Sequence, residues 1–181
     1  HKWNMSWMHD TLSFSRREPV HRRHHHGELP FTLLYAFSER YVLPLSHDEV
    51  VHGKGSLLAK MSGDDWQKFA TLRLLYAWQW ALPGSPLLFM GSELAPWSEW
   101  RHDRPLDWNL IDHEPHRGVH DLVARLNHTV ERHPALWERD DDPTAFEWLE
   151  VEDADHSVYA LLRWAHEGRS AVAAVANWTP V

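Results

Sequence analysis

The residues best suited to chemistry in this sequence are His47 and Asp48, which directly follow a short apolar run. The run, Tyr41–Leu45, reads as a buried strand, with Pro44 near its end because proline cannot donate to a ladder. A carboxylate beside an imidazole could accept hydrogen bonds from two hydroxyls of one sugar ring. Such bonds strengthen as an oxocarbenium-like transition state forms. The pair could equally cap the next loop, and the spacing alone leaves both readings open.

Three tryptophans are candidates to bind the same ligand. The chain contains 12 Trp, against 6 Phe and 4 Tyr, and an indole offers a flat apolar face that suits the apolar face of a sugar. We expect most of these side chains in the core or in helix packing. Trp97, Trp100 and Trp108 instead lie in a long polar loop at residues 91–116, and we predict that they stack on sugar.

Two polar clusters offer alternatives to a sugar site. The first is a group of four histidines among arginines: His21, His24, His25 and His26. Metal ligands must converge, often with cysteine or carboxylate partners, so this cluster favours a solvated or interfacial surface. The second cluster, three aspartates at residues 140–142, is more typical of a solvated linker than of a calcium site. We therefore expect no metal ion and no other cofactor.

The overall charge narrows the possible partners. The chain carries 18 Lys and Arg against 26 Asp and Glu, a net charge of −8. This balance argues against nucleic acid and against an anionic membrane surface, which both favour basic partners, and it is compatible with a neutral ligand. No apolar run approaches the roughly 20 residues of a membrane span. The chain has no cysteine, which fits a reducing cytoplasm.

The elements that must position these residues alternate between strand and helix. The clearest helix is predicted at residues 64–82, where Asp64 and Gln67 form a capping box. Its apolar stripe is predicted to be Trp66, Phe69, Ala70, Leu74, Ala77, Trp78 and Ala81. Further helices are predicted at residues 5–17 and 119–134. The all-apolar run at 86–90 predicts a strand covered on both faces of a parallel sheet.

The sequence changes in character after residue 143, where three β-like runs at 146–151, 157–164 and 171–178 are separated by hairpin turns. The order of elements therefore implies βα units followed by an antiparallel module. The βα part is too short for a (β/α)8 barrel, which needs about 250 residues. The chain also opens at His1 without an initiator methionine, so we expect that upstream sequence is missing.

The run LPLSHDEVVHGK at residues 43–54 resembles the fourth signature region of the α-amylase superfamily, in the form found in glycogen (1,4-α-glucan) branching enzymes. Other segments resemble the same enzymes in the same order: KWNMSWMHDTL (2–12), WQKFATLR (66–73), LLFMGSE (87–93) and FEWL (146–149). The chain departs from the pattern at Ser6, where glycine is expected, and at Phe14, where tyrosine is expected. A third departure, at residues 94–96, leaves details of glucan contact open.

The resemblance implies an α/β fold in two parts. Residues 1–138 would form the C-terminal portion of a (β/α)8 TIM barrel. Residues 139–181 would begin a C-terminal all-β domain, an antiparallel β-sandwich. We expect an enzyme of this kind to be a monomer at full length and to lie in the cytoplasm.

The resemblance also implies a glycosyltransferase reaction, retaining double displacement on an α-glucan such as glycogen or amylose-like chains. An aspartate nucleophile forms a glycosyl-enzyme, a glutamate acts as acid and then base, and an acceptor 6-hydroxyl takes the chain to create an α-1,6 branch. Asp48 matches the transition-state stabiliser, and His47 matches the histidine that binds the same sugar. The nucleophile and the acid/base would lie upstream, so we expect this chain alone to be inactive.

Two other functions stay open. One is a hydrolase or debranching enzyme of the same superfamily, although those enzymes usually have a different pattern after His-Asp. The other is a non-enzymatic carbohydrate-binding module, which the tryptophan content and the β-rich tail favour. That module would bind glucan with residues 1–181 alone.

Overall fold

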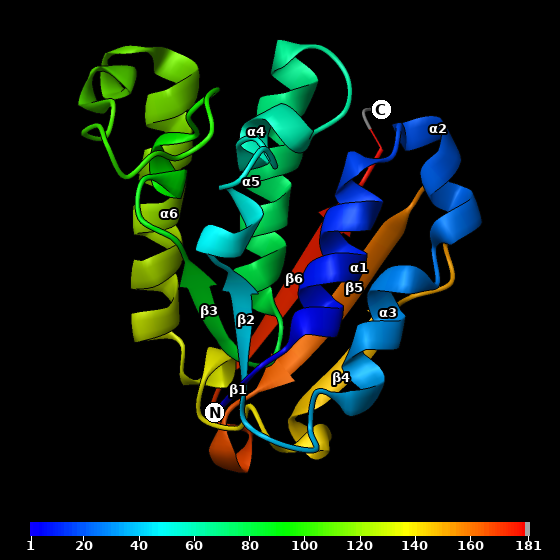
Figure 1. Ribbon diagram of the computed structural model, residues 1–181. Coiled ribbons are helices and arrows are strands. Elements are labelled where there is room, and N and C mark those ends of the chain that lie inside the picture. Colours follow the sequence, from blue (N-terminus) through cyan, green and yellow to red (C-terminus); the bar gives the residue numbers. More distant parts are fainter. Residues whose placement is uncertain (180–181) are drawn as a thin grey trace.

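The computed structural model describes residues 1–179, which contain two three-stranded sheets (Figure 1). The first sheet is parallel, with strands β1 (Lys2–Trp3), β2 (Tyr41–Leu45) and β3 (Ser85–Leu88) in that order. The second sheet is antiparallel, with strands β4 (Phe146–Glu150), β5 (Val158–Trp164) and β6 (Ala171–Asn177) in that order. The predicted change from βα units to consecutive antiparallel strands is confirmed.

Helices connect and cover the strands. The α-helices are α1 (Met5–Arg16), α2 (Pro19–Arg22), α3 (Glu28–Phe31), α4 (Leu57–Lys60), α5 (Asp65–Ala81) and α6 (Glu114–Arg132). The 3-10 helices are η1 (Arg23–His25), η2 (Thr32–Tyr35), η3 (His47–Glu49), η4 (Ser92–Leu94), η5 (Trp108–Asp112), η6 (Pro134–Leu136), η7 (Pro143–Ala145) and η8 (His166–Gly168). Helices α5 and α6 follow β2 and β3 respectively, which makes two βα units beside the shorter unit of β1 and α1.

Helix α5 has the predicted capping box, and its predicted apolar stripe is correct for Phe69 and Trp78 but wrong for Trp66. The Asp64 carboxylate accepts the Gln67 N–H, and the Gln67 side chain accepts the Asp64 N–H, each at 2.9 Å. Trp66 is 66% exposed. The fully buried positions include Leu72 and Leu75, which the stripe did not contain.

The reason is that α5 contacts both sheets. Gln79 Nε2 donates to the Leu43 carbonyl of β2 at 2.8 Å. On another side of the helix, the Trp78 ring packs on Trp148 of β4 and Trp178 after β6, with centroids 6.2 and 6.4 Å away. A helix enclosed in this way is buried over more of its circumference than a single stripe.

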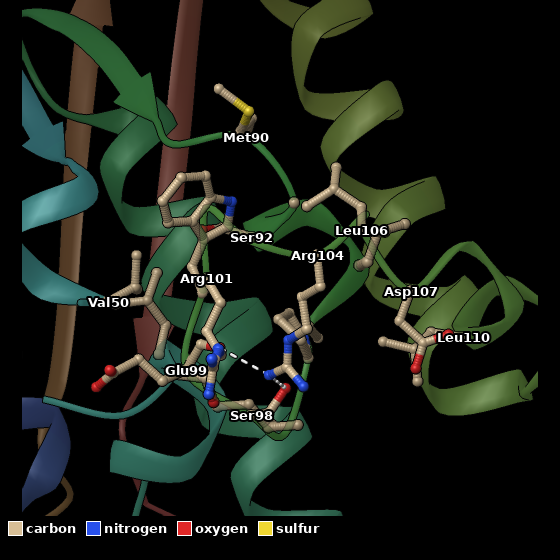
Figure 2. A pocket seen from close by; sticks show the side chains of 18 of the residues that line it. Val50, Met90, Ser92, Ser98, Glu99, Arg101, Arg104, Leu106, Asp107 and Leu110 are labelled. Carbon is tan, nitrogen blue, oxygen red and sulfur yellow. Dashed lines mark hydrogen bonds between the residues drawn. The ribbon is translucent and has the colours of Figure 1, made fainter. Parts of the chain in front are cut away.

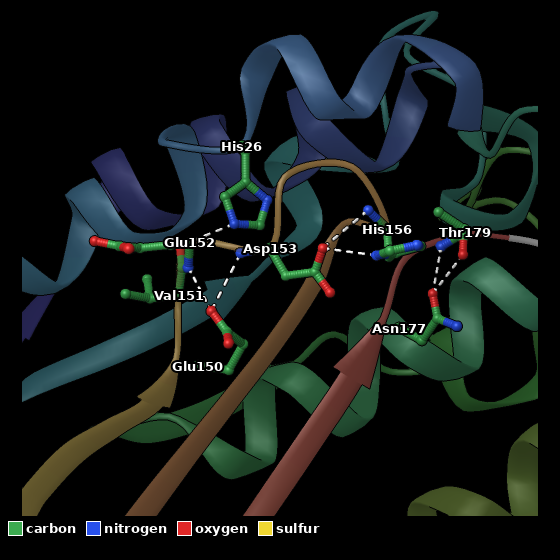
Figure 3. A network of polar contacts seen from close by, with 8 residues as sticks. All are labelled: His26, Glu150, Val151, Glu152, Asp153, His156, Asn177 and Thr179. Carbon is green, nitrogen blue, oxygen red and sulfur yellow. Dashed lines mark hydrogen bonds and ion pairs between the residues drawn. The ribbon is translucent and has the colours of Figure 1, made fainter.

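The histidine–arginine segment at residues 21–26 contains two buried side chains, those of Arg22 and His26. His26 is 8% exposed and its ring stacks on Tyr159 of β5, with centroids 4.2 Å apart. Its Nε2 lies 2.9 Å from the Val151 carbonyl, as Figure 3 shows. Arg22 is 2% exposed and donates to the Trp178 carbonyl at 2.5 Å. The interfacial alternative of the prediction therefore holds for His26 and Arg22, which dock the α1–α2 region onto the antiparallel sheet, whereas His21 and His24 are exposed as on a solvated surface.

The aspartates at 140–142 also do more than link two parts of the chain. Asp140 pairs with Arg163 of β5 at 2.5 Å, and that arginine is 1% exposed. Burial raises the pKa of the Asp140 carboxyl despite this pairing. Asp141 pairs with Arg40, and Asp142 with Arg139. The aspartates therefore tie the segment between α6 and β4 to its neighbours.

The parallel sheet is covered less completely than its apolar composition predicts. Strand β3 ends at Leu88, its apolar residues are half-buried, and Met90 is 59% exposed. Among the described residues, β1 and β3 are the edges of this sheet. Strand β1, which the sequence did not predict, is only two residues long. The sheet therefore presents apolar side chains that other structure could cover.

Candidate functional site

The candidate site begins where β2 ends. Ser46 caps the short helix η3, and its hydroxyl accepts the Asp48 N–H at 3.3 Å. The Val50 N–H then donates to the His47 carbonyl at 2.9 Å. A serine cap after an extended strand turns the chain sharply, so the two side chains between these bonds project from the carboxyl end of the strand.

His47 and Asp48 lie side by side and open to solvent. The His47 Nε2 is 3.2 Å from the Asp48 Oδ1, and the two side chains are 54% and 52% exposed. The Asp48 carboxylate is therefore free of dense packing and can accept hydrogen bonds from a ligand hydroxyl. Burial of the Asp48 side chain inside packed protein would contradict its predicted role, and so would a position at the rim opposite the segment after β3. The structure shows neither.

The segment after β3 meets this pair at the same edge of the sheet. The Phe89 N–H donates to the Leu45 carbonyl at 2.9 Å and continues the pairing of the two strands. The Phe89 ring lies 5.9 Å from the His47 ring and 5.2 Å from the Trp100 ring. The carboxyl ends of parallel strands meet at one edge, which is where α/β proteins place their ligand sites.

A cavity of about 340 Å³ opens within the segment after β3 (Figure 2). Its walls include Trp100, Arg101, Arg104, Leu106 and Asp107. Neither His47 nor Asp48 lines it. The cavity and the exposed pair are therefore neighbours that share the segment at Trp100, and they are not one enclosed pocket.

The three candidate tryptophans have different surroundings. Trp100 lines the cavity and packs on Phe89. Trp97 is 42% exposed, and its ring packs edge-on against Phe69 of α5. Trp108, on η5, is 58% exposed. The structure thus brings Trp100 next to the His47–Asp48 edge and leaves Trp97 and Trp108 outside the cavity lining.

The two glutamates nearest in sequence to these segments face other hollows. The Glu49 carboxylate lies 3.4 Å from Lys54 Nζ, and the residue lines a hollow together with His9 and Arg16 of α1. Glu93 lines a hollow beside Trp80 and His120. A retaining glycosidase needs two carboxyl groups about 5–5.5 Å apart at the scissile bond, and neither glutamate shares a cavity with Asp48.

The sequence reasoning did not find two residues that hold this edge together. Lys60 ends α4, and its ammonium donates to main-chain carbonyls of the loop behind Asp48. Glu99 accepts the Gly55 N–H at 2.8 Å. In the sequence, Lys60 and Glu99 are marked only as charged residues near glycine-containing loops. The tertiary structure is needed to show what each side chain contacts.

Within residues 1–179, no group of three or more histidine or acidic side chains is arranged to hold a metal ion. None of the described helices is both long and apolar enough to cross a membrane.

Comparison with known proteins identifies what these segments resemble. No family model matches the chain. A 1,4-alpha-glucan branching enzyme of Rhizobium etli is 60% identical over 180 residues, 99% of this chain. Branching enzymes of Rhizobium meliloti and Pseudomonas fluorescens are 59% and 55% identical over 99% and 100% of the chain. Over its whole length, this chain is similar to 1,4-alpha-glucan branching enzymes. The chain spans about a quarter of these branching enzymes, 24% of each relative's length.

A solved structure supports the fold alone. A pullulanase mutant from Paenibacillus barengoltzii, crystallised with maltotetraose, matches 77% of this chain and 23% of its own with a TM-score of 0.58. The sequence identity is 17%, so the arrangement of helices and strands is shared where most residue types differ. The branching enzymes resemble the chain in sequence, and the pullulanase resembles it in fold.

Proposed function

We propose that this chain is part of a 1,4-α-glucan branching enzyme, to which it contributes one carboxylate of the active site. The observation that carries the proposal is the identity of 55–60% to branching enzymes over at least 99% of the chain. Similarity at that level includes the segment around His47 and Asp48, so the same chemistry is expected there. The activity belongs to the longer enzyme, since the chain spans 24% of those relatives.

In that enzyme, residues 1–138 form part of a (β/α)8 barrel and residues 139–181 begin an antiparallel β-sandwich. The parallel order of β1, β2 and β3 supports the first assignment, as do the half-buried apolar residues of β3. Further strands beside β1 and β3 would complete the barrel and cover those residues. The hairpins of β4, β5 and β6 support the second assignment. Residues 180 and 181 of this range lie outside the described residues.

Asp48 acts in this proposal as the transition-state stabiliser, and His47 binds the same glucose unit. Their exposed side chains, 3.2 Å apart at the end of β2, could accept hydroxyl hydrogens and donate an imidazole N–H. These bonds strengthen as the ring gains positive charge during cleavage of the α-1,4 bond. The nucleophile and the acid/base come from the remainder of the enzyme, so residues 1–181 alone are inactive.

The substrate is an α-glucan, from which a chain passes to a 6-hydroxyl and forms an α-1,6 branch. Trp100, beside His47 through Phe89, offers an aromatic face for it, and Trp97 and Trp108 remain candidates further along the same loop. The pullulanase with a similar fold was crystallised with maltotetraose, which agrees with a glucan ligand. No cofactor is needed for this displacement. A monomer and a cytoplasmic location remain predictions.

The test is a branching assay with the longer enzyme and with residues 1–181 alone, in which amylose is the substrate and α-1,6 linkages are counted. The longer enzyme should form branches and the short chain should not. A longer enzyme that only hydrolyses amylose would support a superfamily hydrolase in place of this proposal. Tight amylose binding by residues 1–181 without any turnover in the longer chain would support a carbohydrate-binding module.

A further inference from the structure

The loop that follows Asp48, at residues 50–55, has a backbone conformation that contacts from other segments must stabilise. His52, Gly53 and Gly55 all have positive φ, at 60°, 83° and 73°. The left-handed conformation is costly for a residue with a Cβ, such as His52, and glycines widen the range of conformations open to an unfolded loop. Residues 50–55 form no helix or strand. Contacts from elsewhere must therefore select one conformation of this loop.

Lys60 supplies one set of these contacts from the end of α4. Its ammonium donates to the carbonyls of Glu49, Lys54 and Gly55, the last two at 2.8 and 3.2 Å. Three N–H groups and three acceptors match the full donor capacity of a lysine. The first acceptor belongs to the residue directly after Asp48, so the lysine contacts the backbone within one residue of the carboxylate.

The surroundings of Lys60 show that this position is costly for a charge. The pKa of Lys60 is lowered to about 8, mainly by partial burial and also by Arg16 of α1 and Lys54, whereas Glu49 and Glu99 oppose the shift. A lysine on an open surface would avoid this desolvation by turning its ammonium to water. The three carbonyls are what keep it in place.

Glu99 holds the same loop through its main-chain N–H groups. Its carboxylate accepts the Gly55 N–H at 2.8 Å. Main-chain hydrogen bonds from Gly55 and Gly53 hold the pKa of the Glu99 carboxyl below its ordinary value. The Ser56 hydroxyl also donates to the Trp97 carbonyl at 3.2 Å. The loop after β2 and the segment after β3 are thus joined into one unit by groups that leave the Asp48 side chain open.

We propose that Lys60 and Glu99 are positioning residues, which hold the carbonyl and N–H groups of residues 49–55 and so fix the direction of the Asp48 carboxylate. The proposal rests on the proposed function, because the loop needs to be ordered only if Asp48 has the catalytic role proposed for it. The role proposed for both residues is to order the loop and not to bind the glucan. Their effect is expected in turnover more than in substrate binding, since a small misplacement of a reacting group can cost about 10²-fold in rate.

The experiment uses the longer enzyme with Lys60→Met, Lys60→Arg and Glu99→Ala. The matched control is Lys68→Met, because Lys68 of α5 also donates to a carbonyl, that of Met61, but does not contact the loop. Two quantities are measured: hydrogen exchange at the amides of residues 50–55, and kcat and KM for amylose branching.

Lys60→Met should speed exchange in the loop about ten-fold and lower kcat about ten-fold, with KM changed less than about two-fold. Glu99→Ala should do the same to a smaller extent. Lys60→Arg should restore both quantities, because a guanidinium can donate to several carbonyls. Lys68→Met should leave both unchanged. If Lys60→Met does not fold, Glu99→Ala carries the same comparison.

Two results would overturn the proposal. Loop exchange that stays at the wild-type rate in both Lys60→Met and Glu99→Ala would show that neither residue holds the loop. Faster exchange with an unchanged kcat would show that the loop does not direct Asp48. A wild-type enzyme that forms no α-1,6 branches, while Lys60→Met still loosens the loop, would reject the proposed function and leave the role of Lys60 in the loop standing.

Discussion

The main-chain N–H of Trp100 donates to the Val50 carbonyl across 3.0 Å, and this bond joins the segments that follow β2 and β3. Val50 lies two residues beyond Asp48, and the Trp100 ring packs on Phe89, which in turn faces His47. The bond therefore holds an aromatic side chain at the edge of the sheet that carries His47 and Asp48. Two of the four predictions below concern this edge, and the other two concern the antiparallel sheet and the segment before it.

Asp48→Asn should abolish most turnover without affecting the fold. The side chain is 52% exposed, so its amide analogue costs little stability. An amide cannot supply the negative charge that opposes an oxocarbenium-like transition state, and kcat should fall by about 10²–10³-fold. Branching kinetics on amylose and a melting curve of the longer enzyme check this. Near-normal kcat in a folded variant would remove Asp48 from the mechanism.

Trp100→Ala should weaken amylose binding more than Trp108→Ala. Trp100 packs on Phe89 at the catalytic edge, whereas Trp108 lies exposed on η5 and outside the cavity lining. Loss of one aromatic contact is worth about 0.5–1.5 kcal/mol beyond area, which raises KM by about two- to ten-fold. KM for amylose is measured for both variants. A larger effect at Trp108 would move the glucan site along the loop.

Arg22→Met should loosen the contact between the helical segment and the antiparallel sheet. The guanidinium donates to the carbonyls of Ser15, Arg17 and Trp178, and burial lowers its pKa to about 10. Methionine would leave buried carbonyls unpaired, at a cost of about 2–4 kcal/mol in local opening free energy.

Native-state hydrogen exchange at the amides of β5 and β6 measures that opening. Arg23→Met is the control, because Arg23 is exposed and its loss should cost less than about 0.5 kcal/mol. Equal effects of the two variants would show that the buried Arg22 contributes nothing to the contact between the helical segment and the antiparallel sheet.

Asp142 should stabilise the segment before β4 only above acidic pH. Hydrogen bonds from Thr144 and Arg139 lower the pKa of its carboxyl to about 2 from an ordinary value of 3.8. Since the folded-state pKa is the lower one, the contribution is complete above the ordinary value and disappears as the pH falls through about 2. Asp142→Asn should therefore reduce stability at pH 6 and have a much smaller effect at pH 2. Thermal denaturation at both pH values checks this, and an equal effect at both would contradict the assignment.

Local patterns in the sequence predicted the three long helices and five of the six described strands. Strand β2 begins and ends at the predicted residues, and the Asp64–Gln67 capping box is present. These succeed because periodicity and capping act within a few residues. Strand β1 was missed because its two residues become a strand only by pairing with β2. Trp66 was placed in the core because a helical stripe does not reveal which neighbours cover it.

The candidate site was predictable to a smaller degree. His47 and Asp48 lie at the end of a buried strand as expected, and Trp100 follows the next strand. Nothing local indicates that Glu99 contacts the loop 49–55 or that His26 stacks on Tyr159, because these partners come from distant parts of the sequence. Roles that depend on contacts between distant segments need the tertiary structure.

The apolar core runs without interruption from the parallel sheet through α5 to the antiparallel sheet, with Trp78 and Trp178 among its largest members. A chain that ends at residue 138 would thus leave one side of α5 exposed to water, and this truncated chain would be prone to aggregate. Heating should melt both sheets in a single transition. The terminal hairpins cannot be exchanged for those of another protein unless the tryptophans beneath them are redesigned at the same time.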